Sequence, residues 1–389
     1  MENKNSIMMK KIEFALLIGI IFIATNYISL SQEYSNKSVS ESRQNAVTKA
    51  IKKASPAVVG INVTEVRKVL YRNPYGGTLF ERFFGMQRNR VREYEVKGLG
   101  TGFLISSDGY IVTNNHVAGN AKEIVVTMSG GKKYDAEIIG TDPATDIALL
   151  KINADESFPY LKFSDSDEVI IGEWVIALGN PFGLFDINAK PTVTVGVVSN
   201  KGLNLFNEYE NTQTVYKDMI QTDAAISSGN SGGPLVNSNG DLIGMNTMIF
   251  STSQSQSGSG SIGIGFSIPT NRISRIVSLL KDRKHINRNI DIGLDIREID
   301  DRIINYLGIP NVRGVVVYST MNRGLASKAG LEPGDVILKI NDRKVLRKED
   351  YYMEVFDSMV GETLEFEILR GNEEKTVKLQ LVEPKKYRR

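Results

Sequence analysis

The residues best suited to chemistry lie in the segment 229–234, which has the sequence GNSGGP. Glycines on both sides of Ser231 let the backbone turn sharply and let neighbouring N–H groups point at one place. Such a place could stabilise the negative oxygen of a tetrahedral intermediate while the serine hydroxyl attacks a carbonyl carbon. Because an ordinary Ser/Gly turn has the same composition, the rest of the chain must show whether a base is available.

The chain has two histidines that could act as this base, His116 and His285. His285 lies among lysines and arginines, where we expect a solvated surface residue. His116 follows a run of β-branched residues that predicts a strand, and small residues come after it. We therefore predict that His116 takes the proton of Ser231. Since the chain has no cysteine, thiolate nucleophiles and cysteine-ligated zinc are excluded.

An acidic partner for His116 is found at Asp146, which leads directly into an apolar strand and so suits a buried carboxylate. Asp142 precedes a proline, and we interpret it as a turn residue. The order His116, Asp146, Ser231 is that of two-barrel chymotrypsin-like proteases, whereas α/β-hydrolases run Ser, Asp, His. The sequence after Ser231 predicts a hairpin, not the helix that an α/β-hydrolase needs.

The elements that must position these residues are mostly strands. Short runs rich in Val, Ile and Thr, separated by Gly, Asn and Asp, fill residues 55–269 and are typical of a β-sandwich or barrel. A helix over 270–284, with Thr270 as its candidate N-cap, closes this unit. After a charged connector, a second unit has a helix, a turn and a strand over 326–341 and another helix over 348–358.

The composition is that of a globular protein, with 41% hydrophobic and 24% charged residues among 389. The net charge of +2 argues against a nucleic-acid partner, which requires a dense basic surface. Near the N-terminus, Lys10 and Lys11 precede an apolar run of intermediate length. An uncleaved membrane anchor and a cleaved signal peptide both remain open, and either would export the rest of the chain.

Five segments in order resemble the motifs of the HtrA/Deg serine proteases. They are 98–103 (GLGTGF), 108–117 (DGYIVTNNHV), 142–150 (DPATDIALL), 179–183 (GNPFG) and 222–234 (TDAAISSGNSGGP). The resemblance implies a mainly β chain, with a chymotrypsin-like double β-barrel protease domain followed by one α+β PDZ domain. The domains would be an N-terminal signal peptide or anchor at 1–31, a linker at 32–50, the protease domain at 51–283 and the PDZ domain at 287–385.

The resemblance carries the catalytic triad onto His116, Asp146 and Ser231. It also implies that the oxyanion hole is formed by the backbone N–H groups of Gly229 and Ser231, with Asn230 between them. Each such donor contributes roughly 3 kcal/mol to transition-state stabilisation, so their orientation matters as much as the triad.

Substrate preference follows from Ala225, which occupies the position where trypsin-like enzymes that cut after Lys or Arg have an acid. Asp223 falls at the wrong spacing to replace it. We therefore expect cleavage after small or medium aliphatic residues. By analogy, the strand segment of Asn246, Thr247 and Met248 would pair with the substrate backbone.

The C-terminal unit is similar to a single PDZ domain, which binds a C-terminal peptide by adding it as a strand to a sheet edge. The loop that holds the peptide carboxylate would consist of Ile292, Gly293, Leu294 and Asp295. One PDZ domain behind a candidate anchor resembles the membrane-tethered sensor members of the family. Since trimers are the basic assembly of the family, we expect a homotrimer or a higher multiple, to which the aromatic insertion at 67–97 could contribute.

We therefore expect an ATP-independent serine endopeptidase of the periplasm or cell envelope that degrades misfolded or unfolded proteins without a cofactor or metal. The alternative is a PDZ-containing chaperone or binding protein with little proteolytic turnover. The G-x-G-x-x-G pattern at 258–263 follows a Ser/Gln-rich stretch, 251–261, that predicts a flexible loop, so we do not assign it to a nucleotide.

Overall fold

The computed structural model describes residues 19, 22, 25, 26, 42–71, 90–183, 185, 190–205, 214–227, 229–249, 263–283 and 285–384. Most of the predicted N-terminal segment, the tip of the 67–97 insertion and the 251–261 loop lie outside these residues. The Met248 side chain lies outside them as well. No helix in the described part of the chain is long and apolar enough to cross a membrane.

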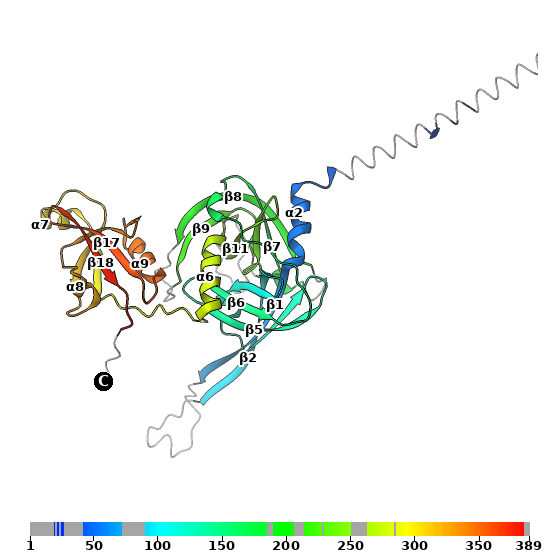
Figure 1. The fold of residues 1–389 in the computed structure, drawn as a ribbon, viewed down its shortest axis with the longest axis horizontal. Coiled ribbons are helices and arrows are strands. Elements are labelled where there is room, and N and C mark those ends of the chain that lie inside the picture. The colour runs from blue at the N-terminus through cyan, green and yellow to red at the C-terminus, as the bar shows by residue number, and fades with distance from the viewer. Residues whose placement is uncertain are drawn as a thin grey trace, which may run out of the picture.

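The first six strands close into a barrel in the order β1-β2-β3-β6-β5-β4. Their bounds are Val58–Tyr71 (β1), Arg90–Leu104 (β2), Tyr110–Asn114 (β3), Glu123–Met128 (β4), Lys133–Asp142 (β5) and Ile147–Ile152 (β6). Fully buried apolar side chains such as Ile61, Phe103 and Leu149 fill the interior. β1 and β2 pair from Val58↔Phe103 to Tyr71↔Arg90 and extend beyond the barrel as a two-stranded ribbon (Figure 1).

The next six strands close into a second barrel, in the order β10-β11-β12-β9-β8-β7. Their bounds are Trp174–Gly179 (β7), Thr192–Leu205 (β8), Tyr216–Thr222 (β9), Pro234–Asn237 (β10), Leu242–Ile249 (β11) and Gly265–Pro269 (β12). The predicted mainly β fold with two chymotrypsin-like barrels is confirmed. β10 and β11 form the hairpin expected after the serine.

Two helices pack on the barrels. Helix α2 (Ala46–Ala54) lies against β7 and β10, and its Lys53 pairs with Asp241 at 2.7 Å. Helix α6 (Thr270–Arg283) contacts strands of both barrels. Thr270 is the first residue of α6, and its hydroxyl donates to the carbonyls of Ser164 and Ile243. This residue therefore ties the helix to the barrel, whereas the sequence predicted an N-cap.

The C-terminal unit is a sheet in the order β13-β14-β15-β17-β18, with β16 paired to β15. The strands are Leu294–Glu298 (β13), Val315–Thr320 (β14), Val336–Ile340 (β15), Arg343–Lys344 (β16), Thr363–Arg370 (β17) and Glu373–Gln380 (β18). The helices are Asp301–Leu307 (α7), Leu325–Ala329 (α8) and Lys348–Asp357 (α9). The predicted α+β PDZ unit is thus present, with its own core around Val317, Phe366 and Ile368.

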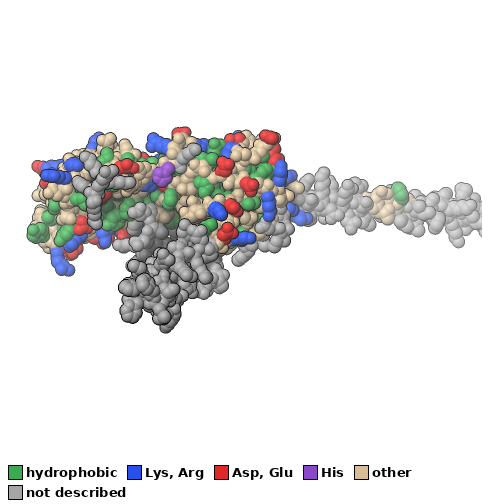
Figure 2. All heavy atoms as spheres, turned by 90° about the horizontal axis from the view of Figure 1, so that it is seen from below, with side chains coloured by type: hydrophobic (Ala, Val, Ile, Leu, Met, Phe, Trp, Pro, Cys, Tyr) green, Lys and Arg blue, Asp and Glu red, His purple; other side chains and the backbone are tan. Residues whose placement is uncertain are grey.

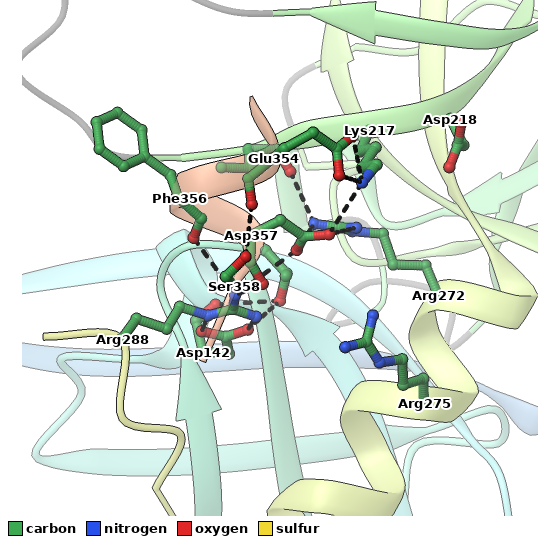
Figure 3. A network of polar contacts seen from close by, with 12 residues as sticks. Asp142, Lys217, Asp218, Arg272, Arg275, Arg288, Glu354, Phe356, Asp357 and Ser358 are labelled. Atoms are coloured by element: carbon green, nitrogen blue, oxygen red, sulfur yellow. Dashed lines mark hydrogen bonds and ion pairs between the residues drawn. The ribbon is translucent and has the colours of Figure 1, made fainter. Parts of the chain in front are cut away.

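A network of buried charges joins this PDZ unit and the connector before it to both barrels (Figure 3). Arg272 of α6 donates two hydrogen bonds to Asp357 of α9, at 2.7 and 3.0 Å. Lys217 of β9 lies 2.8 Å from Glu354 of α9. Arg288, in the connector, donates to both carboxylate oxygens of Asp142, at 3.0 and 2.8 Å. Because both members of each pair are largely buried, water screens these contacts poorly.

The surface carries charges of both signs. On the face seen in Figure 2, Lys and Arg side chains alternate with Asp and Glu side chains and form no continuous basic band. This distribution agrees with the small net charge of the sequence.

Candidate active site

His116 and Asp146 meet at the end of β3, on the side of the first barrel that faces the second. β3 ends at Asn114, and His116 lies in the single-turn helix α4 (Asn115–Ala118) that follows it. Its Nδ1 lies 2.8 Å from Asp146 Oδ2, and its backbone N–H donates to Asp146 Oδ1 at 3.0 Å. One carboxylate thus fixes both the backbone and the ring of the histidine, which leaves Nε2 as the free ring nitrogen.

The environment of His116 adjusts its basicity in two opposite directions. Burial opposes the imidazolium, but the hydrogen bond and the negative charge of Asp146 outweigh this effect and raise the pKa of His116 above its ordinary 6.5. The side chain is half-exposed, whereas that of Asp146 is 5% exposed. A half-exposed base beside a buried carboxylate is what proton transfer to and from a bound substrate requires.

Asp146 receives donors from both barrels. Besides His116, the Thr247 hydroxyl donates to Asp146 Oδ2 at 2.8 Å and the Tyr216 hydroxyl at 3.4 Å. Asp146 has a left-handed φ of +57°, and its carbonyl accepts from the Asn115 N–H and the Asn114 side chain. This backbone conformation is unfavourable for a residue with a side chain, so the surrounding hydrogen bonds must hold it.

Ser231 lies beside this pair in the turn before β10. Its hydroxyl donates to the carbonyl of Thr247 at 3.1 Å. Within the described residues it makes no hydrogen bond to His116. The next residue, Gly232, has no room for a side chain, because a Cβ would lie 2.3 Å from the Thr113 hydroxyl oxygen and 3.2 Å from the backbone N of Asn114. The nucleophile turn is therefore packed against the end of β3, two residues before the histidine.

The predicted oxyanion hole lies in the same turn. Gly229 and Gly232 have φ angles of +95° and +83°, which glycine adopts without strain. Asn230 is buried, and its N–H donates to the Ser227 carbonyl. Within the described part of the chain, neither the Gly229 N–H nor the Ser231 N–H donates to a backbone oxygen.

The other predicted substrate contacts lie in different environments. Ala225 is exposed, and Asp223 accepts a hydrogen bond from the Val197 N–H and so faces β8. Asn246 is fully buried, and its backbone N–H and carbonyl are bonded to Gly233 and Gly232. Those two backbone groups are therefore already occupied and are not free to pair with a substrate. The buried Thr247 directs its hydroxyl to the Asp146 carboxylate.

Comparisons with known proteins agree with this geometry. Residues 100–245 match the family model of a trypsin-like peptidase domain, and residues 260–381 match that of a PDZ domain. A probable periplasmic serine endoprotease, DegP-like, from Chlamydia pneumoniae is 39% identical over 85% of this chain and 69% of its own length. One from Pseudomonas putida (strain GB-1) is 36% identical over 86% of this chain and 69% of its own length. The chain belongs to the HtrA/DegP family of serine proteases.

Solved structures of HtrA-type proteases have the same fold as this HtrA/DegP-family protease. The HtrA-type protease AlgW with a decapeptide is 31% identical, with a TM-score of 0.64 over 86% of this chain and 98% of that one. A serine endoprotease from Yersinia pestis is 29% identical, with a TM-score of 0.57 over 87% of this chain and 98% of that one. The predicted serine endopeptidase class is confirmed.

The loop assigned to PDZ peptide binding leads into β13 of this HtrA/DegP-family protease. Ile292 is buried, Asp295 is exposed, and Gly293 has a φ of +71°. The Gly293 N–H donates to the Asp291 carboxylate at 3.0 Å. That N–H group is therefore already occupied, and a peptide carboxylate would have to displace the Asp291 side chain from it.

The sequence did not predict the polar residues that support the site of this protease through buried hydrogen bonds and ion pairs. The hydroxyl of Thr247 supports Asp146, although the sequence indicated only a substrate-pairing strand. Asp142 opens the predicted turn, with its carbonyl accepting from the Thr145 N–H at 3.2 Å, but its carboxylate is also the buried partner of Arg288, which the sequence did not indicate. Both contacts join residues far apart in the chain, and no local pattern marks them. His285 is exposed, as expected of a surface residue.

Proposed function

We propose that this serine endopeptidase uses His116, Asp146 and Ser231 as its catalytic triad. The observation that carries the proposal is the 2.8 Å contact between His116 Nδ1 and Asp146 Oδ2, beside a serine whose hydroxyl is bonded to Thr247, the residue that also supports Asp146. Rotation about the Ser231 side chain would exchange the Thr247 carbonyl for Nε2 of His116. A bound substrate would favour this rotation, because the hydroxyl must then face the scissile carbonyl.

In the proposed reaction, Ser231 Oγ attacks the carbonyl carbon while His116 Nε2 takes its proton. The N–H groups of Gly229 and Ser231 stabilise the oxyanion. The imidazolium then protonates the leaving amine, and an acyl-enzyme forms on Ser231. Water, deprotonated by His116, hydrolyses this ester and restores the serine. Asp146 stabilises the imidazolium in both halves of the reaction.

We further propose that the substrates are unfolded or misfolded proteins, in line with a role in protein quality control in the periplasm or cell envelope. The PDZ domain would bind C-terminal peptides and so recruit substrates or regulate the peptidase. The names of the curated relatives support a periplasmic location. We also propose that the N-terminal segment exports the chain, either as an uncleaved membrane anchor or as a cleaved signal peptide. N-terminal sequencing of the mature protein distinguishes the two.

The proposed homotrimer is supported by an exposed apolar patch on the second barrel. Ile170, Ile171, Trp174 and Val195 are between 41% and 67% exposed and lie on β7, on β8 and in the turn before β7. Exposed apolar side chains that lie close together on a surface can mark contacts with other chains. A second copy of this chain is the partner that the family resemblance implies.

The proposed mechanism is tested by digestion of casein with the wild-type chain and its Ser231→Ala variant, together with labelling by a fluorophosphonate. We expect the variant to lose digestion and labelling while it keeps its thermal unfolding midpoint. Equal digestion by both proteins would refute the triad. Failure of the wild type to digest or react, while it still prevents casein aggregation, would favour the chaperone alternative.

A further inference from the structure

Thr101 is a buried residue of the first barrel that contacts the nucleophile turn of the second. It lies in β2 at the centre of the GLGTGF segment, and its side chain is not exposed to solvent. Its hydroxyl donates to the Gly229 carbonyl at 2.5 Å, and its N–H donates to the Ser231 carbonyl at 3.1 Å. One residue therefore holds the carbonyls of both residues whose N–H groups form the proposed oxyanion hole.

The direction of the Thr101 hydroxyl is fixed by a third contact. Its oxygen accepts a hydrogen bond from the Asn180 N–H at 2.8 Å. A hydroxyl has a single proton, and the donor from Asn180 occupies one of its lone pairs. The proton is thus directed to Gly229. The carbonyl of Thr101 is held in turn by the Thr113 hydroxyl at 2.7 Å, so the polar groups of this residue are all engaged.

These contacts fix three successive peptide groups. Thr101 holds the carbonyls of Gly229 and Ser231, and the Gly233 N–H holds the Asn230 carbonyl between them at 2.9 Å. The Ser231 N–H belongs to the same planar peptide group as the Asn230 carbonyl, so its direction is set. Gly229 has more conformational freedom than Asn230 and Ser231, and its carbonyl receives the shortest of the three bonds.

Packing makes this arrangement specific. A Cβ at Gly232 would lie 2.1 Å from the Thr101 carbonyl oxygen, and one at Gly233 would lie 3.0 Å from Thr101 Cγ2. The two glycines after the serine therefore leave the space that Thr101 occupies. The GLGTGF segment and the GNSGGP segment fit against each other across the junction of the barrels.

We propose that Thr101 is a positioning residue of the oxyanion hole: by holding the carbonyls of Gly229 and Ser231 it fixes the peptide groups on both sides of the one that carries the Ser231 N–H, and so directs that N–H at the substrate carbonyl oxygen. This inference rests on the catalytic roles proposed above for Ser231 and the two N–H groups. Thr101 touches neither the substrate nor the reacting atoms, so its removal should affect the transition state more than substrate binding.

The test compares four substitutions in the full chain. Thr101→Val removes the hydroxyl at constant shape, and Thr101→Ser and Thr101→Ala differ from each other by the hydroxyl alone. Thr127→Val is the matched control, because Thr127 is a buried threonine of the same barrel whose hydroxyl has no partner among the described residues. The measured quantities are kcat and KM for a peptide substrate, the thermal unfolding midpoint, and the Kd of a peptide boronic acid whose tetrahedral adduct places an oxygen in the oxyanion hole.

Removal of one oxyanion donor lowers kcat about 10²–10³-fold in other proteases, so misdirected donors should lower it at least about tenfold. We expect this loss in Thr101→Val and Thr101→Ala, with KM nearly unchanged and boronate affinity reduced by a similar factor. Thr101→Ser should retain most activity, and Thr127→Val should behave like the wild type. The Ser/Ala pair decides the question if Thr101→Val does not fold.

The inference is overturned if folded Thr101→Val or Thr101→Ala keeps kcat within twofold of the wild type. It is also overturned if Thr101→Ser and Thr101→Ala lose activity equally, or if kcat falls without a loss of boronate affinity. A wild-type enzyme no more active than Ser231→Ala would instead refute the proposed mechanism itself, so the two failures are distinguishable.

Discussion

Asp357 offers a quantitative test of how the PDZ unit is held against the barrels. Its carboxylate accepts two hydrogen bonds from Arg272 and lies 3.6 Å from both Lys217 Nζ and Arg288 Nη1 (Figure 3). Burial alone would raise the pKa of this carboxyl. The three cations outweigh burial and lower the pKa of Asp357 to about 2, from an ordinary 3.8.

The difference between these two pKa values corresponds to about 2 kcal/mol of folding free energy. Because the pKa is lowered in the folded state, this stabilisation is complete above the unfolded value and is lost as the pH falls toward 2. About half of it remains at pH 3. We therefore expect Asp357→Asn to lower the unfolding free energy by at least about 2 kcal/mol at pH 7, since the buried cations also lose their partner.

The measurement is urea unfolding at pH 7 and pH 3, in the Ser231→Ala background to prevent self-digestion. Urea is uncharged and leaves the ion pairs unscreened. Glu362→Gln is the matched control, because its ion pair with Arg275 joins the same two units at 3.1 Å but is largely exposed. Such a pair contributes less than about 1 kcal/mol. A loss in Asp357→Asn below 0.5 kcal/mol at pH 7, or one that does not shrink at pH 3, would refute the reasoning; the 0.5 kcal/mol limit is about the size of an ordinary surface substitution.

Three further predictions concern activity and assembly. Since the pKa of His116 is raised, the acid limb of the kcat/KM profile should have its midpoint above 6.5, with activity lost as the pH falls below it. Asp146→Asn should move this midpoint down and lower kcat roughly 10⁴-fold, and an unmoved midpoint would contradict the assignment. Peptides with Ala or Val before the cleaved bond should react faster than peptides with Lys or Arg, and Ala225→Asp should shift the ratio toward the basic residues by about tenfold or more; fastest hydrolysis after Arg by the wild type would rule out the pocket argument. If the proposed trimer forms through the patch on the second barrel, Trp174→Arg should convert it to monomers in analytical ultracentrifugation, whereas Tyr306→Arg, at another exposed aromatic, should not.

The proposed triad could be put forward from the sequence because its three members lie in local sequence patterns. Ser231 lies between glycines, Asp146 begins an apolar strand and His116 follows one, so each pattern is visible within a few residues. The order of the three along the chain then distinguished two barrels from an α/β-hydrolase. The structure joins His116 to Asp146 directly and places Ser231 beside them through Thr247.

The supporting contacts could not be predicted, because they depend on how the barrels and the PDZ unit pack. Thr101, Thr247 and Asp142 are small polar residues at strand positions, where the sequence indicates only a fit to a pleated sheet. Their partners lie in other elements, and many threonines in the chain share the same local surroundings. Thr127, for instance, is equally buried in the same barrel, yet its hydroxyl contacts no described polar group.

The hydrogen bond between Thr101 and Gly229 joins residues that are 128 positions apart. Contacts of such long range form late in folding, because the intervening chain must first be ordered. The nucleophile turn thus acquires its final backbone geometry only after both barrels have formed and docked. We expect refolding chains to regain barrel structure, as measured by circular dichroism, before they regain peptidase activity. Proteolysis would then be confined to fully assembled molecules, without a separate inhibitory segment being needed during synthesis.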